Sequence, residues 1–205
     1  MAVAKQLFEK GDFLFNFDLK SAYHHIEILR DHRKYLGFAW NDGNKRVFYQ
    51  FNVLLFGLAT APHIFTKLTR VIVSHWRSQG LRVIMYLDDG LGGSRTFEEA
   101  EWVSDNVKKS LQELGFLIAH EKSEWKPSQI VTWLGFNWHT DTGVLQATSE
   151  RIERAILALT FVIYQVNVSK NNLVPVRFLA SVVGQIISQA HSIGKVVRLR
   201  TRALY

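Results

Sequence analysis

Three aspartates are the residues of this chain best suited to chemistry. Asp18 follows a short apolar run, and Asp88 and Asp89 stand together after a second one. If the two runs are neighbouring strands, the carboxylates meet at one point, where each raises the pKa of the others unless a cation neutralises them. Hard oxygen ligands, in a chain without cysteine, favour magnesium. The pattern predicts a phosphoryl-transfer site in which two ions act on the attacking and leaving oxygens.

Each aspartate also has a purely structural interpretation. Asp89-Gly90 is a common hairpin turn, and Asp18 alone suits the N-terminal cap of a helix. Taken separately, such residues more often serve the backbone than a metal ion. His24 and His25 do not extend the ligand set, because neighbours in sequence rarely face the same site. We expect a structural role for both.

Short apolar runs and turn residues fill the first half of the chain. Residues 13–17 predict a strand that ends at Asp18, and the aromatic-rich runs 35–40 and 47–53 predict a hairpin around residues 41–44. A proline near the first turn and apolar residues at helical spacing predict a helix over 61–79. Residues 81–87 predict a strand that reaches the paired aspartates, where the chain reverses into 91–94.

The clearest helix begins at a capping box, Thr96 with Glu99, and ends at Gly115. We expect strands over 116–119 and 130–138, and a turn at 141–143 that leads back into 144–147. Beyond Thr148 the apolar residues keep helical spacing in two stripes, 152–166 and 178–187. A soft domain boundary therefore falls near residue 148.

The order of these elements indicates the fold class. Strand, helix, strand-turn-strand, helix, strand is the order of a ferredoxin-like split βαβ unit, here with a hairpin inserted after its first strand. We expect an α+β fold, in which an antiparallel sheet is backed by helices over residues 1–148, followed by a helical segment over 149–205. Such a sheet brings the end of the first strand beside the strand-turn-strand tip.

Composition and charge bound the class of protein. Apolar residues make up 47% of the chain and charged residues 21%, which is a globular profile. The net charge of +7 lies in residues 151–205, which hold eight Lys or Arg and one acid. A basic C-terminal part suits a polyanion, although a solvated basic face explains the charge equally well. We expect no export signal and no membrane span, and the lack of cysteine fits a reducing intracellular setting.

Five segments, in order, resemble motifs A to E of the reverse transcriptases and together cover most of residues 11–139. They are Phe17-Asp18-Leu19-Lys20-Ser21-Ala22-Tyr23, Phe56-Gly57-Leu58-Ala59-Thr60-Ala61-Pro62, Tyr86-Leu87-Asp88-Asp89, Leu114-Gly115-Phe116 with Lys122, and Trp133-Leu134-Gly135-Phe136. The resemblance implies a polymerase palm followed by a thumb. The tail, from Phe178-Leu179-Ala180 through Gly184 to Arg202, looks most like the DIRS-type retrotransposons, which carry a tyrosine recombinase elsewhere in their polyprotein.

The resemblance implies a role for each matched residue. Asp18 and Asp88 would be the principal ligands of two Mg²⁺ ions, with Mn²⁺ as an alternative, while Asp89 is the third acid and Leu19 offers its carbonyl. Tyr23 would be the steric gate against the 2′-hydroxyl of the nucleotide, although a core aromatic is the alternative.

Further residues would contact the substrates. Phe56 and Gly57 would line the nucleotide and template side, and Lys122 would protonate the departing pyrophosphate, although a solvated lysine is nearly as plausible. Leu134 and Gly135 would form the primer-grip hairpin, for which the alternative is a packed strand. The basic residues expected to track duplex phosphates are Lys195, Arg198, Arg200 and Arg202.

The resemblance also implies partners and a rival function. The partners are a primer–template duplex, deoxynucleoside triphosphates and the remaining polyprotein domains, an RNase H or a recombinase. Related enzymes carry much of the fingers before motif A, whereas 17 residues precede Asp18 here. We therefore expect largely missing fingers. The alternative to a polymerase core is a truncated, non-catalytic remnant that binds nucleic acid.

Overall fold

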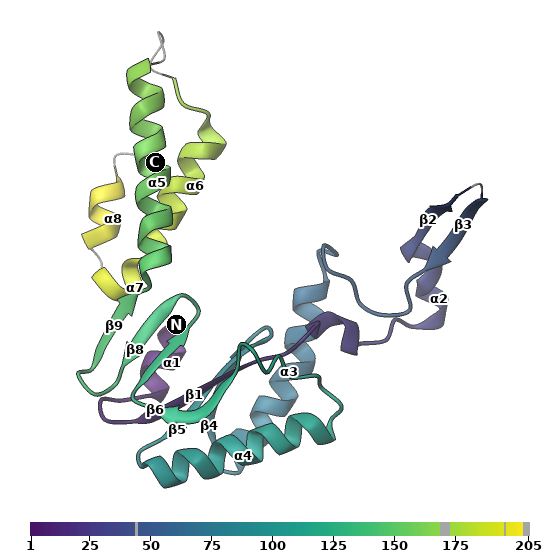
Figure 1. The fold of residues 1–205 in the computed structure, drawn as a ribbon, viewed down its shortest axis with the longest axis horizontal. Helices are drawn as coiled ribbons and strands as arrows, with labels where there is room; N and C mark the ends of the chain where they lie inside the picture. The colour runs from purple at the N-terminus through teal and green to yellow at the C-terminus, as the bar shows by residue number, and fades with distance from the viewer. Residues whose placement is uncertain (44, 169–172, 195, 203–205) are drawn as a thin grey trace. The chain divides into compact units, whose positions relative to one another are not determined.

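The computed structural model describes residues 1–43, 45–168, 173–194 and 196–202 (Figure 1). They form two compact units. One consists of residues 13–127, and the other joins residues 1–12 to residues 128–205. We call them the sheet unit and the terminal unit. In the described part of the chain, every helix is too short or too polar to cross a membrane.

The sheet unit is built on a four-stranded sheet with the spatial order β4-β5-β1-β6. This is the strand order of a ferredoxin-like fold, so the α+β class predicted from the sequence is confirmed. Two helices connect the strands and pack beside them (Figure 1). The elements are β1 (Phe13–Asp18), α3 (Ala61–Ser78), β4 (Arg82–Tyr86), β5 (Asp89–Ser94), α4 (Phe97–Glu113) and β6 (Glu124–Ser128).

Local signals explain where the two helices begin and end. Pro62 occupies the first turn of α3, where the missing N–H costs nothing. The hydroxyl of Thr96 accepts a hydrogen bond from the N–H of Glu99 and caps α4, as the sequence predicts. The Glu99 carboxylate accepts a hydrogen bond from Ser94. Gly115, at a φ of +80°, ends the helix.

Glycines in β5 make room for aromatic rings from β1. Phe17 pairs with Gly90 and Phe15 with Gly92 across the two strands. A Cβ atom at Gly90 would lie 2.1 Å from the Phe17 ring, and one at Gly92 would lie 2.3 Å from the Phe15 ring. The rings therefore lie directly over the β5 backbone, and they pack against Trp125 from β6, with ring centroids 5.3 Å from Phe17 and 5.9 Å from Phe15.

The helices cover this aromatic face of the sheet. Trp76 of α3 contacts Phe17 edge-to-face at 6.3 Å, and its indole N–H donates to the hydroxyl of Ser110 on α4. Trp76 is 1% exposed, and Phe15 is fully buried. Because side chains alternate along a strand, Asp18 lies on the opposite face from Phe17.

A second, smaller sheet is inserted between β1 and α3. The predicted hairpin is confirmed: β2 (Gly37–Asp42) pairs with β3 (Lys45–Gln50), with Trp40 opposite Val47. Short turns of helix precede it, namely η1 (Ala22–His25), α2 (Arg30–Arg33) and η2 (Lys34–Leu36).

The prediction of a strand over residues 116–119 is wrong. Only one isolated bridge, between Leu19 and Ile118, forms there. The fourth strand of the sheet is β6, where a single large aromatic residue, Trp125, stands between charged neighbours and Pro127 follows. That sequence has no alternating apolar signal, and proline is tolerated because β6 is an edge strand.

The terminal unit combines a three-stranded antiparallel sheet with helices. The elements are α1 (Ala2–Leu7), β7 (Ile130–Trp133), β8 (Phe136–His139), β9 (Val144–Ala147), α5 (Ser149–Val168), α6 (Val176–Ser188), α7 (Ala190–Ile193) and α8 (Val196–Thr201). The strand expected over 130–138 is two strands, because the chain turns at Leu134-Gly135. The N–H of Gly11 donates to the carbonyl of Thr140 and joins the N-terminal segment to this unit.

The predicted C-terminal helices form, but the apolar stripe of α5 is not a core. Phe161 of α5 contacts Phe178 of α6 edge-to-face at 5.0 Å. Among the residues of α5, all of which the structure describes, none is buried. Ile156 and Ile163 remain 56% and 54% exposed. The boundary near residue 148, between a palm with a hairpin and a thumb-like segment, stays a prediction.

The fit of Phe15 over Gly92 predicts a specific stability change. Gly92→Ala should lower the free energy of unfolding by about 2 kcal/mol or more, because the new methyl group meets the ring. Phe15→Leu should recover part of this loss in the double variant, as measured by a double-mutant cycle in urea. Gly184→Ala is the matched control, because nothing lies within 4 Å of its Cβ position. That control should be neutral or slightly stabilising. An equal loss in both alanine variants would contradict the packing argument.

Candidate active site

The sheet brings Asp18 and Asp89 side by side. Asp18 is the last residue of β1 and Asp89 is the first residue of β5, and the two are directly opposite in the antiparallel register. Asp88 lies in the two-residue turn between Tyr86 and Asp89, and its carbonyl accepts a hydrogen bond from the N–H of Leu19. The juxtaposition that the sequence predicts for the end of the first strand and the paired aspartates is therefore present.

The three carboxyl groups are electrostatically coupled. Burial is the main cause that raises the pKa of Asp89 to about 6, and the charges of Asp88 and Asp18 raise it further. Burial also raises the pKa of Asp18, although Lys122 opposes that shift. The Asp18 carboxylate is stabilised by a hydrogen bond from Asp89, so the protonated partner is Asp89. The site therefore carries more negative potential than its own side chains neutralise.

The donor set fits a divalent cation in its chemistry. The available ligands are carboxylate and carbonyl oxygens, which magnesium prefers, and a nearby dication would lower the raised pKa of Asp89. Within the part of the chain that the structure describes, no three acidic or histidine side chains are gathered closely enough to hold a metal ion. Asp18 and Asp89 form the close pair, and Asp88 acts on both through its charge.

Lys122 lies beside the aspartates. Its ammonium nitrogen is 3.9 Å from a carboxylate oxygen of Asp18, while 65% of its side chain remains exposed. The loop that carries Lys122 is fixed to β1: the N–H of Ala119 donates to the carbonyl of Asp18, and the N–H of Asp18 donates to the hydroxyl of Ser123. Ser123 is a positioning residue that the sequence interpretation missed, since a lone serine in a polar loop gives no signal.

Tyr23 lies in an aromatic group next to the acids. It is 8% exposed, and its ring centroid is 4.6 Å from Phe56 and 5.5 Å from Phe65. Burial raises its pKa, and so do the charges of Asp88 and Tyr86, which shows that the ring lies within electrostatic reach of the turn. Phe56 itself is 60% exposed. The structure thus brings together Tyr23 and Phe56, which the sequence predicts to lie on the nucleotide side of the site. Gly57 follows Phe56 and has a φ of +86°.

His25 has the structural role expected of it. Its Nδ1 bonds the carbonyl of Ala22, and its Nε2 accepts a hydrogen bond from the N–H of Leu117. Both ring nitrogens are therefore engaged with the backbone, and the ring ties η1 to the loop after α4. The ring of His24 contacts Phe56 edge-to-face at 5.5 Å.

Backbone strain is concentrated in the predicted site segments. In the described residues, the non-glycine positions with positive φ are Ser21, Leu87 and Leu134, at +54°, +55° and +50°. Ser21 lies between Asp18 and Tyr23, Leu87 precedes Asp88, and Leu134 begins the hairpin turn. A left-handed conformation is unfavourable for a leucine, and strain of this kind clusters at functional sites.

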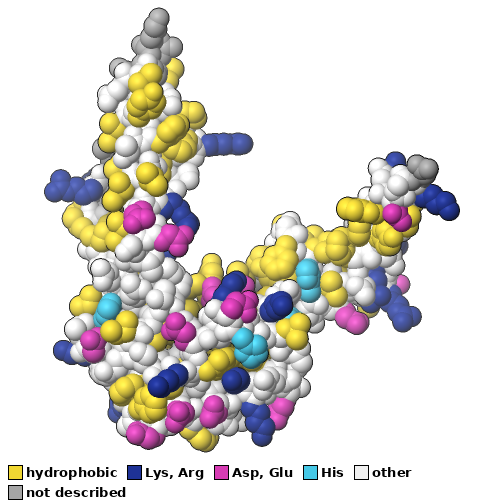
Figure 2. All heavy atoms as spheres, viewed as in Figure 1, with side chains coloured by type: hydrophobic (Ala, Val, Ile, Leu, Met, Phe, Trp, Pro, Cys, Tyr) yellow, Lys and Arg dark blue, Asp and Glu magenta, His cyan; other side chains and the backbone are white. Residues whose placement is uncertain are grey.

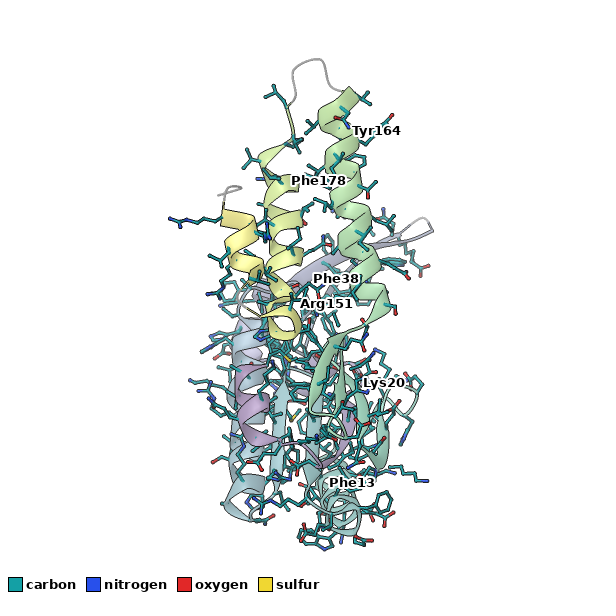
Figure 3. All side chains as sticks on the ribbon, turned by 90° about the vertical axis from the view of Figure 1, so that its left-hand side faces the viewer. Phe13, Lys20, Phe38, Arg151, Tyr164 and Phe178 are labelled. Carbon is teal, nitrogen blue, oxygen red and sulfur yellow. The ribbon has the colours of Figure 1, made fainter. Side chains whose placement is uncertain are left out.

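Leu134 and Gly135 form the tip of the β7–β8 hairpin. Both have positive φ, which is the geometry of a type I′ turn. Arg151, in the first turn of α5 (Figure 3), donates to the carbonyl of Leu134 at 3.0 Å, and its guanidinium lies 4.5 Å from the centroid of Phe136. The side chain that holds this turn was not identified from the sequence, because one arginine among eight basic residues is not distinctive.

The basic residues predicted to contact nucleic acid lie at the C-terminal end. Arg198 and Arg200 are exposed on α8, and Arg202 is exposed just beyond it. Lys195 lies outside the described residues. This spacing of exposed arginines would suit contacts with successive phosphates, and it would equally suit a basic surface that faces only water.

The fold is similar to solved polymerase domains. Two structures of the foamy viral protease-reverse transcriptase, one in complex with double-stranded DNA and one with an RNA/DNA hybrid, match 92% of this chain with TM-scores of 0.68 and 0.67. Their sequences are 20% identical to it, and the matches span 29% and 23% of those chains.

The sequence comparisons identify the family. The family model of reverse transcriptase (RNA-dependent DNA polymerase) matches residues 4–138, so the chain belongs to that family. A putative enzymatic polyprotein of Cassava vein mosaic virus is 31% identical over 109 residues, which is 53% of this chain and 16% of that protein. The chain thus spans a small part of its relatives. The family consists of RNA-directed DNA polymerases, and the reverse transcriptase resemblance is confirmed.

The raised pKa of Asp89 predicts how stability depends on pH. The folded state holds the Asp89 proton more tightly than the unfolded state does, so protonation of Asp89 stabilises the fold. This contribution to stability is full below about pH 3.8 and is lost as the pH rises through about 6. Asp89→Asn keeps a donor to Asp18 and should raise stability near pH 7 by on the order of 1 kcal/mol, after allowance for partial exposure. Urea unfolding in a chelator from about pH 4 to about pH 8 measures this. Asp105→Asn, on an exposed part of α4, should leave the pH profile unchanged.

The conformation of Leu134 predicts a gain in stability on substitution. Asparagine tolerates the left-handed region, so Leu134→Asn should raise the free energy of unfolding by about 1 kcal/mol. Gly135→Ala should lower it, because its φ is +73° and the new Cβ would lie 2.9 Å from Arg151. Urea unfolding of the two variants tests the turn assignment. A destabilised Leu134→Asn would show that side-chain packing outweighs the strain.

Proposed function

We propose that this chain is a reverse transcriptase core that adds deoxynucleotides to a primer 3′-hydroxyl by template-directed, two-metal-ion phosphoryl transfer. The observation that carries the proposal is the register of β1 with β5. It places Asp18 opposite Asp89 and next to the Asp88 turn, on the sheet face opposite the aromatic core. A cluster of coupled carboxylates is the group that a metal-dependent transfer of phosphate requires.

The proposed metal ligands are Asp18, Asp88, Asp89 and the carbonyl of Leu19. When bound, Mg²⁺ or Mn²⁺ would supply charge neutralisation at the triphosphate and activation of the primer hydroxyl. Backbone hydrogen bonds position the proposed ligands. The N–H of Leu19 holds the carbonyl of Asp88 and fixes the turn, and Ser123 holds the backbone of Asp18. The Asp89 proton must leave before the pair can act as a dianionic ligand.

Tyr23 is proposed as the gate that selects deoxynucleotides. Its ring is held by Phe56 and Phe65, and it lies close enough to Asp88 for that charge to raise its pKa. A ring packed in this way can exclude a 2′-hydroxyl by contact. Phe56 and Gly57 would complete the nucleotide and template side.

Lys122 is proposed as the acid that protonates the departing pyrophosphate. The ammonium nitrogen is 3.9 Å from Asp18, and the exposed side chain can extend from there toward a bound triphosphate. In the resting protein, the same charge partly offsets the carboxylates. One lysine would thus lower the electrostatic cost of the site and serve as the proton donor.

The terminal unit would bind the primer–template duplex. The Leu134-Gly135 turn is the proposed primer grip, supported by Arg151, which fixes the Leu134 carbonyl. Arg198, Arg200 and Arg202 would contact phosphates from an exposed helix. Lys195 belongs to the same proposal by sequence alone.

The proposed biological setting is a retrotransposon polyprotein of the DIRS type. The segment that carries the resemblance runs from Phe178 on α6 through Gly184 to Arg202 beyond α8. The polymerase substrates would be deoxynucleoside triphosphates, and further partners would be RNase H or recombinase domains of the polyprotein. The Cassava vein mosaic virus relative is itself a polyprotein by name.

Primer extension tests the proposed function. The purified chain, given a primer on an RNA or DNA template, Mg²⁺ and deoxynucleotides, should extend the primer, and Asp88→Asn should abolish extension because a metal ligand is removed. Asp105→Asn is the matched control and should retain activity. Tyr23→Ala should lower the preference for deoxynucleotides over ribonucleotides by about tenfold or more, as measured by kcat/KM for each.

The same assay separates the two functions considered for this chain. Extension that survives Asp88→Asn would contradict the assigned site. A parent protein that binds duplex normally but extends no primer with either Mg²⁺ or Mn²⁺ would instead favour the non-catalytic, nucleic-acid-binding remnant.

A further inference from the structure

His25 is a half-buried histidine that the proposed chemistry does not use. It belongs to η1, the same four-residue turn that contains Tyr23, and its ring bonds a residue 92 positions further along the chain. The N–H of Leu117 donates to its Nε2 at 3.0 Å, and the ring also packs beside Phe116, with centroids 5.1 Å apart. The side chain thus connects the turn of the proposed nucleotide gate to the loop that leads to Lys122.

The two hydrogen bonds of the ring define where its proton lies. Because the N–H of Leu117 can only donate, Nε2 must be an unprotonated acceptor. The proton of the neutral ring is then on Nδ1, which donates to the carbonyl of Ala22 at 3.1 Å. One bond of His25 is therefore local to η1, and the other reaches across to the loop after α4.

Leu117 is held through its backbone rather than through its side chain. Its carbonyl accepts a hydrogen bond from the N–H of Lys20 at 2.8 Å, and its N–H donates to His25. Leu117 is 60% exposed, although Phe116 and Ile118 on either side of it are buried. The backbone of the loop therefore meets the segment after β1 at two points, and the His25 ring makes the second of them.

The backbone bonds between the two segments end before η1. They run from the end of β1 to Lys20, whose N–H donates to Leu117. Ser21 then takes a φ of +54°, and the chain turns away to form η1. Beyond Lys20, the hydrogen bond that joins these segments in the described part of the chain is the one to His25. That bond therefore limits how far η1, and with it Tyr23, can move from the loop.

We propose that His25 is a positioning residue for nucleotide selection. Its bond to Leu117 holds η1 against the loop after α4 and so limits the movement of the Tyr23 ring relative to Lys122. A gate that acts by contact is sensitive to small displacements, since a shift of about 1 Å can change a rate by about 100-fold. The inference rests on the proposed function for what Tyr23 and Lys122 do, whereas the position of η1 can be measured without catalysis.

Two substitutions separate the two bonds of the ring. The amide group of asparagine lies as many bonds from Cβ as Nδ1 does, and that of glutamine as many as Nε2 does. His25→Asn therefore keeps a donor for Ala22 and loses the bond to Leu117, whereas His25→Gln keeps an acceptor for Leu117. We expect His25→Asn to lower the preference for deoxynucleotides over ribonucleotides by about fivefold or more, and His25→Gln to stay within about twofold of the parent. The measurement is kcat/KM for each nucleotide in primer extension.

Amide hydrogen exchange in a chelator measures the position of η1 without catalysis. The N–H groups of His24 and Ile26 donate to carbonyls of the preceding turn, so their exchange reports on η1. His25→Asn should speed their exchange, and that of Leu117, by about fivefold or more, because a hydrogen bond that protects both segments is lost. The His25→Gln variant should exchange as the parent does.

Other histidine side chains at the surface of the sheet unit provide a matched control (Figure 2). His75→Asn makes the same substitution at an exposed position near the end of α3. It should change neither the nucleotide preference nor the exchange at η1. Urea unfolding of each variant establishes that it is folded under the conditions of both measurements.

Two results would overturn the inference. The first is equal exchange at His24 and Ile26 in the two His25 variants, because the bond to Leu117 would then not hold η1. The second is a lower free energy of unfolding in His25→Asn with an unchanged nucleotide preference, which would leave His25 a purely structural role. A parent protein that extends no primer would refute the proposed function instead, and the exchange measurement would still decide whether His25 holds η1.

Discussion

The antiparallel register between β1 and β5 is the constraint on which the candidate site depends. Phe17 and Phe15 lie over Gly90 and Gly92, where a side chain would overlap the rings. A slip of one residue would move Leu91 to the aromatic face and Asp89 away from Asp18. The packing of the helix-covered face therefore sets the position of the carboxylates on the opposite face. Glycines that look like weak strand residues are what make this register specific.

Two hairpin turns, one in each unit, are held in conformations that their residues do not prefer. Leu87 and Leu134 each begin a two-residue hairpin loop with a positive φ, where glycine or asparagine would be favourable. The flanking strand pairs, Tyr86 with Asp89 and Trp133 with Phe136, impose the turn geometry. The strained backbone at these two leucines lowers the stability locally, and the pairing of the flanking strands holds it in place.

The sequence predicted the elements whose signals are local. The capping residue Thr96 defined one helix, and the order of strands and helices defined the sheet. The aspartates were brought together by that order. The sequence failed where the signal depends on tertiary contacts: β6 is a strand because Trp125 stacks on Phe17, and nothing in its own composition indicates this. The apolar stripe of α5 predicted burial that the fold does not provide.

The charge balance of the site connects its stability to its proposed chemistry. Two carboxylates in register and a third in the adjoining turn face one lysine, which is 65% exposed and 3.9 Å from Asp18. An exposed ion pair contributes little, so Lys122 offsets only part of the repulsion. Below about pH 6 the repulsion is instead relieved by a proton on Asp89, whose pKa rises to about 6. Near neutral pH that proton is weakly held, and a divalent cation can replace it at small cost. The unfavourable pairing that lowers the stability of the fold is therefore the property that would give the site its affinity for metal ions.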